Sequence, residues 1–316
     1  VSGGQKSIVV VANANVSKED AATLTGLYAV EKDYLNEVDG SLSMNSKTYL
    51  VDIQPGVTNY LGYTKPTNDD TNAYLDQNPV KLYRNVAKVN LASIEVNTKG
   101  AQNVYPNAKL DVKNIYVLHA AAKTKIVGGA SAWHSTEVKG DWLIGSSVED
   151  YTTWVGTIEA WMAKDEEKNK PLKKYLEKNY TNNGLLKAVN LDAVSSLVDQ
   201  VGAVENVCNF YTFENLNLNG NENVHTLLVV EGTFSYGSGE SNKVSSTRYY
   251  TVSVGHDGVE HNGQLDGLTR GDVGVLRNLQ YNISLTVKGP IQLRLVRKLK
   301  MIHSWMLRLR LLILAT

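Results

Sequence analysis

The stretch that decides the fold is YNISLTVK, residues 281–288, near the C-terminal end of the chain. Apolar and polar residues alternate strictly along it, and its apolar members are Tyr281, Ile283, Leu285 and Val287. In a β-strand successive side chains point to opposite faces, so a period of two places one face on a core and the other in water. The stretch therefore predicts a half-buried β-strand.

The same alternation recurs in several other segments: KNIYVLHAAAK (113–123), HTLLVVEGTFSY (225–236) and STRYYTVSVG (246–255). The chain also has 17 Tyr against 3 Phe. Tyrosine suits a half-buried pleated surface because its ring packs while its hydroxyl stays in water. Together these features predict an all-β protein of the extracellular type.

One long strand-like run, from Val80 to Val96, changes the face of its apolar residues twice. Even-numbered apolar positions give way to odd ones near Ala87, and even ones return at Ile94. A strand keeps one face unless an extra residue shifts its register, so the run predicts bulges or bends.

Helices are expected to be few and short. Ser17 followed by Asp20 and Ser147 followed by Asp150 are capping-box patterns, and Pro171 stands at the start of a third helical segment. They predict helices within residues 17–30, 146–162 and 171–178, with apolar stripes that pack on a core.

A polar, turn-forming segment at 64–82, bracketed by Pro66 and Pro79, indicates a domain boundary. We expect an N-terminal β-domain over residues 1–78 and a larger C-terminal β-domain over residues 79–290. We expect residues 128–206 to form an insertion in the second domain.

Composition excludes several functional classes. Residues 1–290 hold 26 basic and 32 acidic residues, a net charge of −6, which argues against nucleic acid and against a membrane surface as partners of the body. A single cysteine, Cys208, rules out a disulfide framework, and its strand-like surroundings favour a small buried side chain over a reactive thiol.

Two short motifs are candidate binding sites. The stretch GHDGVEHNGQLDG (255–267) places two histidines and two acids within six residues, His256, Asp257, Glu260 and His261, but its glycines and asparagine are typical of a solvated loop. Arg270-Gly271-Asp272 is a tripeptide that some host-cell receptors recognise in exposed loops, but a three-residue match occurs often by chance. No G-x-S-x-G elbow and no carboxylate pair of a glycosidase can be identified in the sequence. We therefore predict no catalytic, cofactor or metal site, no small-molecule substrate, and a protein that is not an enzyme.

Several segments occur together in an order that resembles a known family. They are GGQKSIVVVANA (3–14), PGVTNYLGYT (55–64), NPVKLYRNVAKVNLASIEV (78–96), LDVKNIYVLHA (110–120), NFYTFEN (209–215), RYYTVSV (248–254) and LRNLQYNISLTVKGP (276–290). Their order resembles the fimbrillins of Bacteroidales, specifically the major fimbrial subunit (FimA type) of type V pili. The most specific marker is the closing block with Arg277-Asn278, Tyr281 and Lys288-Gly289-Pro290.

The resemblance implies two transthyretin-like β-sandwich domains with short helices in insertions. It implies a precursor anchored at the outer membrane as a lipoprotein, removal of an N-terminal strand, and a fimbrium built by donor-strand exchange. Its partners would be copies of itself, related fimbrial subunits and host surface ligands that support adhesion. The alternative within the same reading is a tip or accessory adhesin that binds a host ligand or carbohydrate.

The sequence departs from the family pattern at both ends. It begins at the GGQ block, so the family's first strand is expected to be missing and the sequence to be incomplete. Residues 291–316 carry six Lys or Arg and no acid, where the family has an acidic linker and an alternating donor strand. Regrouping compatible codons from Ile291 restores such a linker and strand, and the visible Leu307–Leu311 then overlies a V-K-V-K-V pattern. We expect this tail to be frameshifted and assembly to be impaired; a basic amphipathic membrane tail and an unusual native strand are the competing readings.

Overall fold

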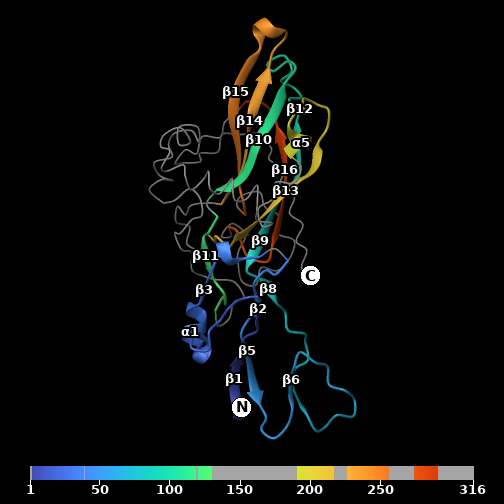
Figure 1. Cartoon of the computed structure of the whole chain (residues 1–316). Helices are drawn as coiled ribbons and strands as arrows, with labels where there is room; N and C mark the ends of the chain where they lie inside the picture. The colour runs from blue at the N-terminus through green and yellow to red at the C-terminus, as the bar shows by residue number, and fades with distance from the viewer. Residues whose placement is uncertain are drawn as a thin grey trace, which may run out of the picture. The chain divides into compact units, whose positions relative to one another are not determined.

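The computed structural model describes residues 2–38, 40–118, 120–129, 191–216, 226–255 and 274–290. Strands are the main regular secondary structure in this part of the chain, and the helices in it are few and short (Figure 1). The all-β class expected from the sequence is confirmed. The two transthyretin-like sandwiches remain a prediction.

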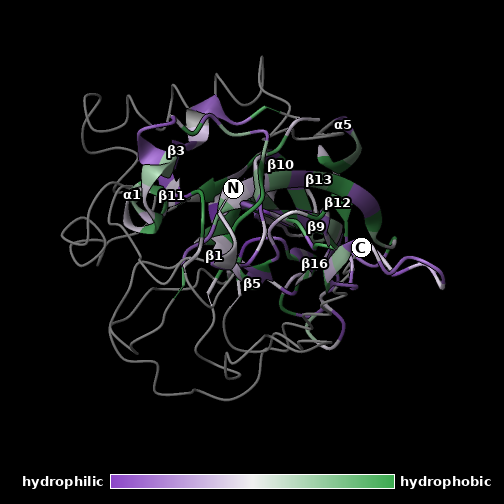
Figure 2. Ribbon diagram, turned by 90° about the horizontal axis from the view of Figure 1, so that it is seen from below, coloured by the Kyte–Doolittle hydropathy of each residue, from purple (hydrophilic) through white to green (hydrophobic). Residues whose placement is uncertain are grey.

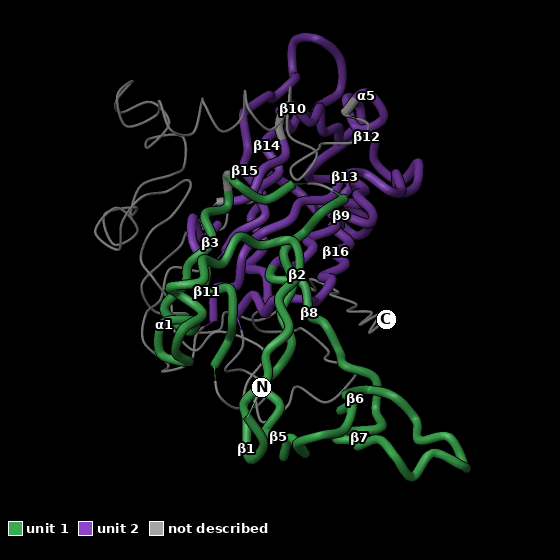
Figure 3. Tube along the Cα trace, turned by 60° about the horizontal axis from the view of Figure 1, so that its bottom comes forward, with its two compact units in different colours: residues 1–85, 124–137 green, residues 86–123, 138–316 purple. Residues whose placement is uncertain are grey.

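The chain separates into two compact units, coloured green and purple in Figure 3. Unit 1 comprises residues 1–85 and 124–137, and unit 2 comprises residues 86–123 and 138–316. The domain limits proposed from the sequence, 1–78 and 79–290 with an insertion at 128–206, remain predictions. The tail at 291–316 and the expected helices at 146–162 and 171–178 lie outside the described residues.

Unit 1 is built from short strands in small sheets. The described strands and their pairings are β1 (Gly4–Ile8) with β5 (Tyr49–Ile53), β4 (Met44–Asn45) between β2 (Val11–Ala12) and β8 (Tyr83–Arg84), β3 (Glu31–Asp33) with β11 (Lys123–Lys125), and β6 (Asn59–Leu61) with β7 (Ala73–Asp76). The β6–β7 pair is parallel, whereas β1 and β5 are antiparallel. Such short pairs bury little surface on their own and depend on further packing.

The first predicted helix is divided in two by Thr23. Ser17 accepts a hydrogen bond from the Asp20 amide (3.0 Å), as the capping pattern predicts, but only the short η1 (Asp20–Ala22) follows it. Thr23 is extended, and its side chain accepts from the Gly26 amide to start α1 (Leu24–Ala29). The helical part of unit 1 is therefore shorter than the sequence predicts; a further 3-10 turn, η2, covers Tyr34–Asn36.

Unit 2 contains a four-stranded antiparallel sheet in the order β12 (Leu197–Val198), β10 (Lys109–Leu118), β14 (Leu227–Tyr236) and β15 (Val244–Ser253). Three of these strands run side by side over about their full length (Figure 1). The short helix α5 (Leu191–Val194) precedes β12, and the 3-10 turn η4 (Glu240–Asn242) joins β14 to β15.

The second sheet of unit 2 has β9 (Val86–Val96) at its centre. On one side β9 pairs antiparallel with β13 (Val204–Phe213), and on the other it pairs parallel with β16 (Gln280–Val287). The alternation that predicted β16 is confirmed, because its four apolar residues are buried while Ser284 is exposed. Hydrophobic residues recur along the strands of this unit (Figure 2).

A register shift explains the second change of face in the run from Val80 to Val96. Leu91 pairs with Ile283 and Ser93 with Ser284, so Ala92 is the extra residue of a bulge. The bulge lets both Leu91 and Ile94 enter the core, where each is fully buried. The bulge predicted from the sequence is confirmed there.

Candidate assembly site

The N-terminal apolar run of unit 1, Ile8 to Val11, is only half-buried. Its backbone is paired at both ends, where Ile8 lies opposite Tyr49 and Val11 opposite Asn45. Between them the Val10 amide donates to Ser46 Oγ (2.9 Å) and the Ser46 amide donates to the Val10 carbonyl (2.8 Å). Consecutive apolar residues of this kind are normally covered on both faces. The described residues leave this run incompletely enclosed.

The sheet beside this run is a two-stranded pair. β1 and β5 pair over five positions, from Gly4 opposite Ile53 to Ile8 opposite Tyr49, and within the described ranges neither strand is hydrogen-bonded to a second strand. Tyr49 and Val51 are 8% and 7% exposed, whereas Leu50 between them is 65% exposed. Open strand edges with apolar side chains nearby are the features to which an additional strand adds, through backbone hydrogen bonds and side-chain pockets.

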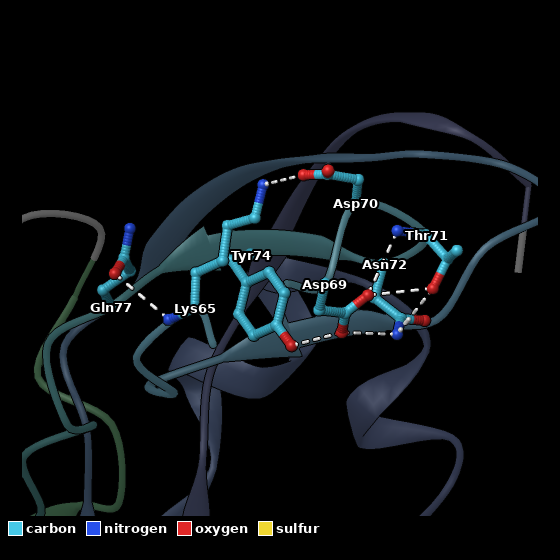
Figure 4. Close-up of polar contacts among 7 residues, drawn as sticks. All are labelled: Lys65, Asp69, Asp70, Thr71, Asn72, Tyr74 and Gln77. Atoms are coloured by element: carbon cyan, nitrogen blue, oxygen red, sulfur yellow. Dashed lines mark hydrogen bonds and ion pairs between the residues drawn. The ribbon is translucent and has the colours of Figure 1, made fainter. Parts of the chain in front are cut away.

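A polar cluster organises the loop between β6 and β7 (Figure 4). The Asp69 carboxylate accepts hydrogen bonds from the Tyr74 hydroxyl (2.7 Å), the Asn72 side-chain amide (2.7 Å), and both the amide and hydroxyl of Thr71 (3.1 and 2.8 Å). The Tyr74 hydroxyl, followed by Asn72 and Thr71, holds the pKa of Asp69 well below its usual range. The same bond to Asp69 raises the pKa of Tyr74 to about 12.

Three tyrosine rings gather beside this loop. Tyr60 and Tyr74, opposite each other in the β6–β7 pair, stack with centroids 5.1 Å apart, and Tyr63 meets Tyr60 edge-on at 5.5 Å. Tyr63 is 62% exposed. Tyr60 and Tyr74 are half-buried, so Tyr63 is the exposed member of this aromatic cluster.

The closing block of unit 2 is locked by a buried ion pair. Arg277, fully buried just before β16, donates from Nε to Glu214 Oε2 (2.9 Å) and from its terminal nitrogen to Glu214 Oε1. The Tyr281 hydroxyl accepts from the Leu276 amide (2.9 Å) and donates to the Gly274 carbonyl (3.2 Å). These bonds place the turn that leads into β16.

The other end of β16 is held at Gly289. The Tyr250 hydroxyl donates to the Gly289 carbonyl (3.1 Å), and a Cβ placed on Gly289 would lie 2.9 Å from the Tyr105 ring. The edge-on contact of Tyr105 with Tyr236, whose ring centroid lies 5.1 Å away, holds the Tyr105 ring in place. Glycine is needed here for space, and these contacts fix the chain next to its last described residue, Pro290.

The described residues hold no group of three or more histidine, cysteine or acidic side chains that could bind a metal ion. Cys208 is buried, and burial raises the pKa of its thiol to about 12. His256, Asp257, Glu260, His261 and the segment Arg270-Gly271-Asp272 lie outside the part of the chain that the structure describes. Within that part, no helix is long and apolar enough to cross a membrane.

Sequence reasoning singled out Arg277, Tyr281 and Gly289 as a family marker but missed their partners. Glu214 could have been predicted as the partner of Arg277, because an acid at the end of the aromatic block NFYTFEN requires a cation if it is buried. Tyr105 and Tyr250 gave no comparable signal, because their contact with Gly289 depends on long-range packing.

Residues 1–84 match the family model of the major fimbrial subunit protein (FimA). No curated protein matches the chain. Among solved structures, a protein assigned to cell adhesion from Parabacteroides distasonis ATCC 8503 is similar, with a TM-score of 0.56 at 23% identity, and the match covers 92% of this chain and 78% of that one.

Two further solved structures share the fold. A second cell adhesion assignment from the same organism has a TM-score of 0.55 at 17% identity and covers 90% of this chain and 67% of that one. A fimbrilin (FimA) from Porphyromonas gingivalis W83 has a TM-score of 0.50 at 21% identity, covering 92% of this chain and 75% of that one. At these identities the structures show a shared fold. The resemblance to the Bacteroidales fimbrillins is therefore confirmed, through the FimA family match over residues 1–84 and the fold of most of the chain.

Proposed function

We propose that the chain is a structural subunit of a cell-surface fimbria that polymerises by donor-strand exchange. The observation that carries the proposal is the open-edged β1–β5 pair beside the half-buried run from Ile8 to Val11. A strand donated by a neighbouring subunit would pair with an open edge and cover these apolar side chains. The match of residues 1–84 to the FimA family supports the same role.

The donated strand is proposed to come from the segment that follows Gly289-Pro290. In this sequence the segment is the cationic run 291–316. We propose that the alternating strand of the family lies in a shifted reading frame of the same codons. The printed tail would offer the neighbour arginines where apolar residues are needed, and burying unpaired charges is costly. Assembly is therefore proposed to require the restored frame.

The remaining parts of the proposal follow from this role. The subunit would be located in the extracellular fimbrium after anchoring of its precursor at the outer membrane as a lipoprotein. Its partners would be its own copies and related fimbrial subunits, and the fibre would support adhesion to host surface ligands. The protein would act structurally, without catalysis.

The experiment compares the chain that carries the cationic tail 291–316 with a version whose reading frame after Pro290 is restored. Both are purified and examined on gels under mild denaturation and by electron microscopy. We expect ladders of oligomers on gels and fibres from the restored version, and monomers from the chain with the cationic tail. A restored version that stays monomeric at high concentration would contradict the proposal.

A matched pair of variants locates the acceptor. In the restored background, Val9→Asp places a charge in the half-buried run, whereas Ser7→Asp places the same charge at an exposed position two residues away. Val9→Asp is expected to abolish ladders while Ser7→Asp preserves them. Equal ladders from both variants would move the acceptor away from this run.

A tip or accessory adhesin is the second candidate, and the tyrosine cluster at the β6–β7 loop, in which Tyr63 is exposed, favours it. Exposed aromatic clusters commonly mark interaction sites, and Tyr63 is 62% exposed there. A tip subunit would cap fibres grown from a shaft subunit and stop their extension, whereas a shaft subunit would be incorporated along them. Adding the restored protein to growing fibres distinguishes the two.

A further inference from the structure

Two strands lie close to the first and last described residues of unit 2. Asn85 is the last residue of the N-terminal part of unit 1, and β9 begins at the next residue, Val86. At the other end, β16 finishes at Val287, and the described chain ends three residues later at Pro290. A pull along the covalent chain thus reaches the described part of unit 2 first through β9 and last through β16.

These two strands are parallel and paired over eight positions, from Lys88 opposite Gln280 to Val96 opposite Val287. Tension enters at the N-terminal end of β9 and leaves at the C-terminal end of β16, which are opposite ends of the pair. The pair is then loaded along its length, in shear, and its backbone hydrogen bonds share the load. If both loaded ends lay at the same end of the pair, the bonds would break one after another.

Side chains add links across the same pair. Asn90 donates to Asn282 (2.9 Å), and Thr286 donates to Glu95 (3.0 Å). These bonds lie on either side of the bulge at Ala92. Each bond resists sliding of β16 along β9, because a shift of one residue would separate both partners.

Both ends of β16 are anchored outside the pair. The buried Arg277–Glu214 ion pair ties the residues before β16 to the end of β13, and the Tyr250 hydroxyl with the Tyr105 ring holds Gly289. The strand's apolar face is buried along its whole length. β16 therefore cannot be peeled from its C-terminal end without first releasing Gly289.

We propose that the parallel β9–β16 pair is a mechanical clamp that gives unit 2 high resistance to tension applied between the chain ends. Its value in a fibre rests on the proposed fimbrial function, but the mechanical property belongs to the isolated chain. Failure of assembly and failure of the clamp are therefore separate outcomes.

Single-molecule pulling tests the clamp with one C-terminal handle and two alternative second attachment points. A handle at the N-terminus loads β9 through Val86 once unit 1 has opened. A handle on Lys99→Cys, at the exposed turn after β9, loads the C-terminal ends of both strands. We expect the force that unfolds unit 2 to be several-fold higher with the N-terminal handle. Equal forces in the two geometries would overturn the proposal.

A variant series keeps the test independent of folding defects. Asn282→Ala with Thr286→Ala removes both cross-strand side-chain bonds, and Ser284→Ala, at an exposed position on the same strand, is the matched control. Each protein is first checked by thermal unfolding and circular dichroism. The double variant is expected to lose unfolding force in the N-terminal geometry while the control keeps it. An unchanged unfolding force in a folded double variant would show that the two side-chain bonds do not contribute to the clamp, and would contradict the role proposed for them.

Discussion

Arg277 and Glu214, 63 residues apart in the sequence, form a buried ion pair that joins the end of β13 to the start of β16. The guanidinium is fully buried, and its Nε lies 2.9 Å from Glu214 Oε2. A planar guanidinium that binds both carboxylate oxygens fixes direction as well as distance. The pair therefore determines where the chain turns to place β16 parallel to β9.

Replacement of Arg277 by Met is expected to destabilise unit 2 by about 3–5 kcal/mol, because the buried Glu214 carboxylate loses this partner. Denaturant unfolding measures the change. The double variant Arg277→Met with Glu214→Leu is expected to recover much of the loss, since no charge then stays buried. A single variant as stable as the parent would show that the pair contributes nothing to the fold.

Gly289→Ala is expected to cost about 1–3 kcal/mol, the range for forcing an extra methyl group into a packed site, because the new Cβ meets the Tyr105 ring. Thermal unfolding compares this variant with Ser284→Ala, which changes an exposed residue of β16, the strand that ends just before Gly289. In a Tyr105→Ala background the cost of Gly289→Ala should shrink. If the cost were the same in both backgrounds, the close approach of the ring would not be its cause.

Asp69→Ala is expected to lower the pKa of Tyr74 from about 12 towards its ordinary value of 10.0, because the hydroxyl loses its carboxylate acceptor. Tyrosine ionisation followed by ultraviolet absorbance at alkaline pH measures the shift. The folded-state pKa of Tyr74 is raised, so the stabilisation it contributes is complete below pH 10 and is lost as the pH rises towards 12.

The matched control for that titration is Asp70→Ala, which removes the exposed ion pair with Lys65 and leaves the Tyr74–Asp69 bond in place. Its tyrosine titration should be the same as that of the parent. A Tyr74 pKa that stays near 12 in Asp69→Ala would assign the shift to burial of the ring.

Cys208 is expected to resist thiol reagents at neutral pH, because the side chain is buried and its pKa is raised to about 12 by that burial. The single thiol then reports on the opening of unit 2. Reaction with a chromogenic disulfide should begin only in denaturant, at the midpoint found by circular dichroism. Rapid reaction of the folded protein would place Cys208 at an accessible edge.

Strands with period-two alternation were predictable from the sequence, because a half-buried sheet imposes its pattern directly on the residues. YNISLTVK is β16 almost residue for residue, and the bulge at Ala92 was visible as a change of face between Leu91 and Ile94. The helix at Ser17 was predicted too long, since the sequence pattern did not reveal that Thr23 is extended and starts a separate helix.

Contacts that depend on topology were not predictable from local pattern. The parallel pairing of β9 with β16 joins residues about 190 positions apart, such as Asn90 and Asn282, and alternation alone does not choose a partner or a direction. The Asp69 cluster was also missed, because it is made of ordinary turn residues whose side chains meet only when β6 and β7 pair.

Hydrogen–deuterium exchange of the monomer and of the fibre, both made from the frame-restored protein, tests the account most directly. Assembly by strand donation predicts that residues 4–12 and the paired strand 49–53 become strongly protected in the fibre, because their open edges acquire backbone partners. The β9–β16 pair should exchange slowly in both states. Fibres in which residues 4–12 and 49–53 exchange as fast as in the monomer would contradict strand donation to unit 1.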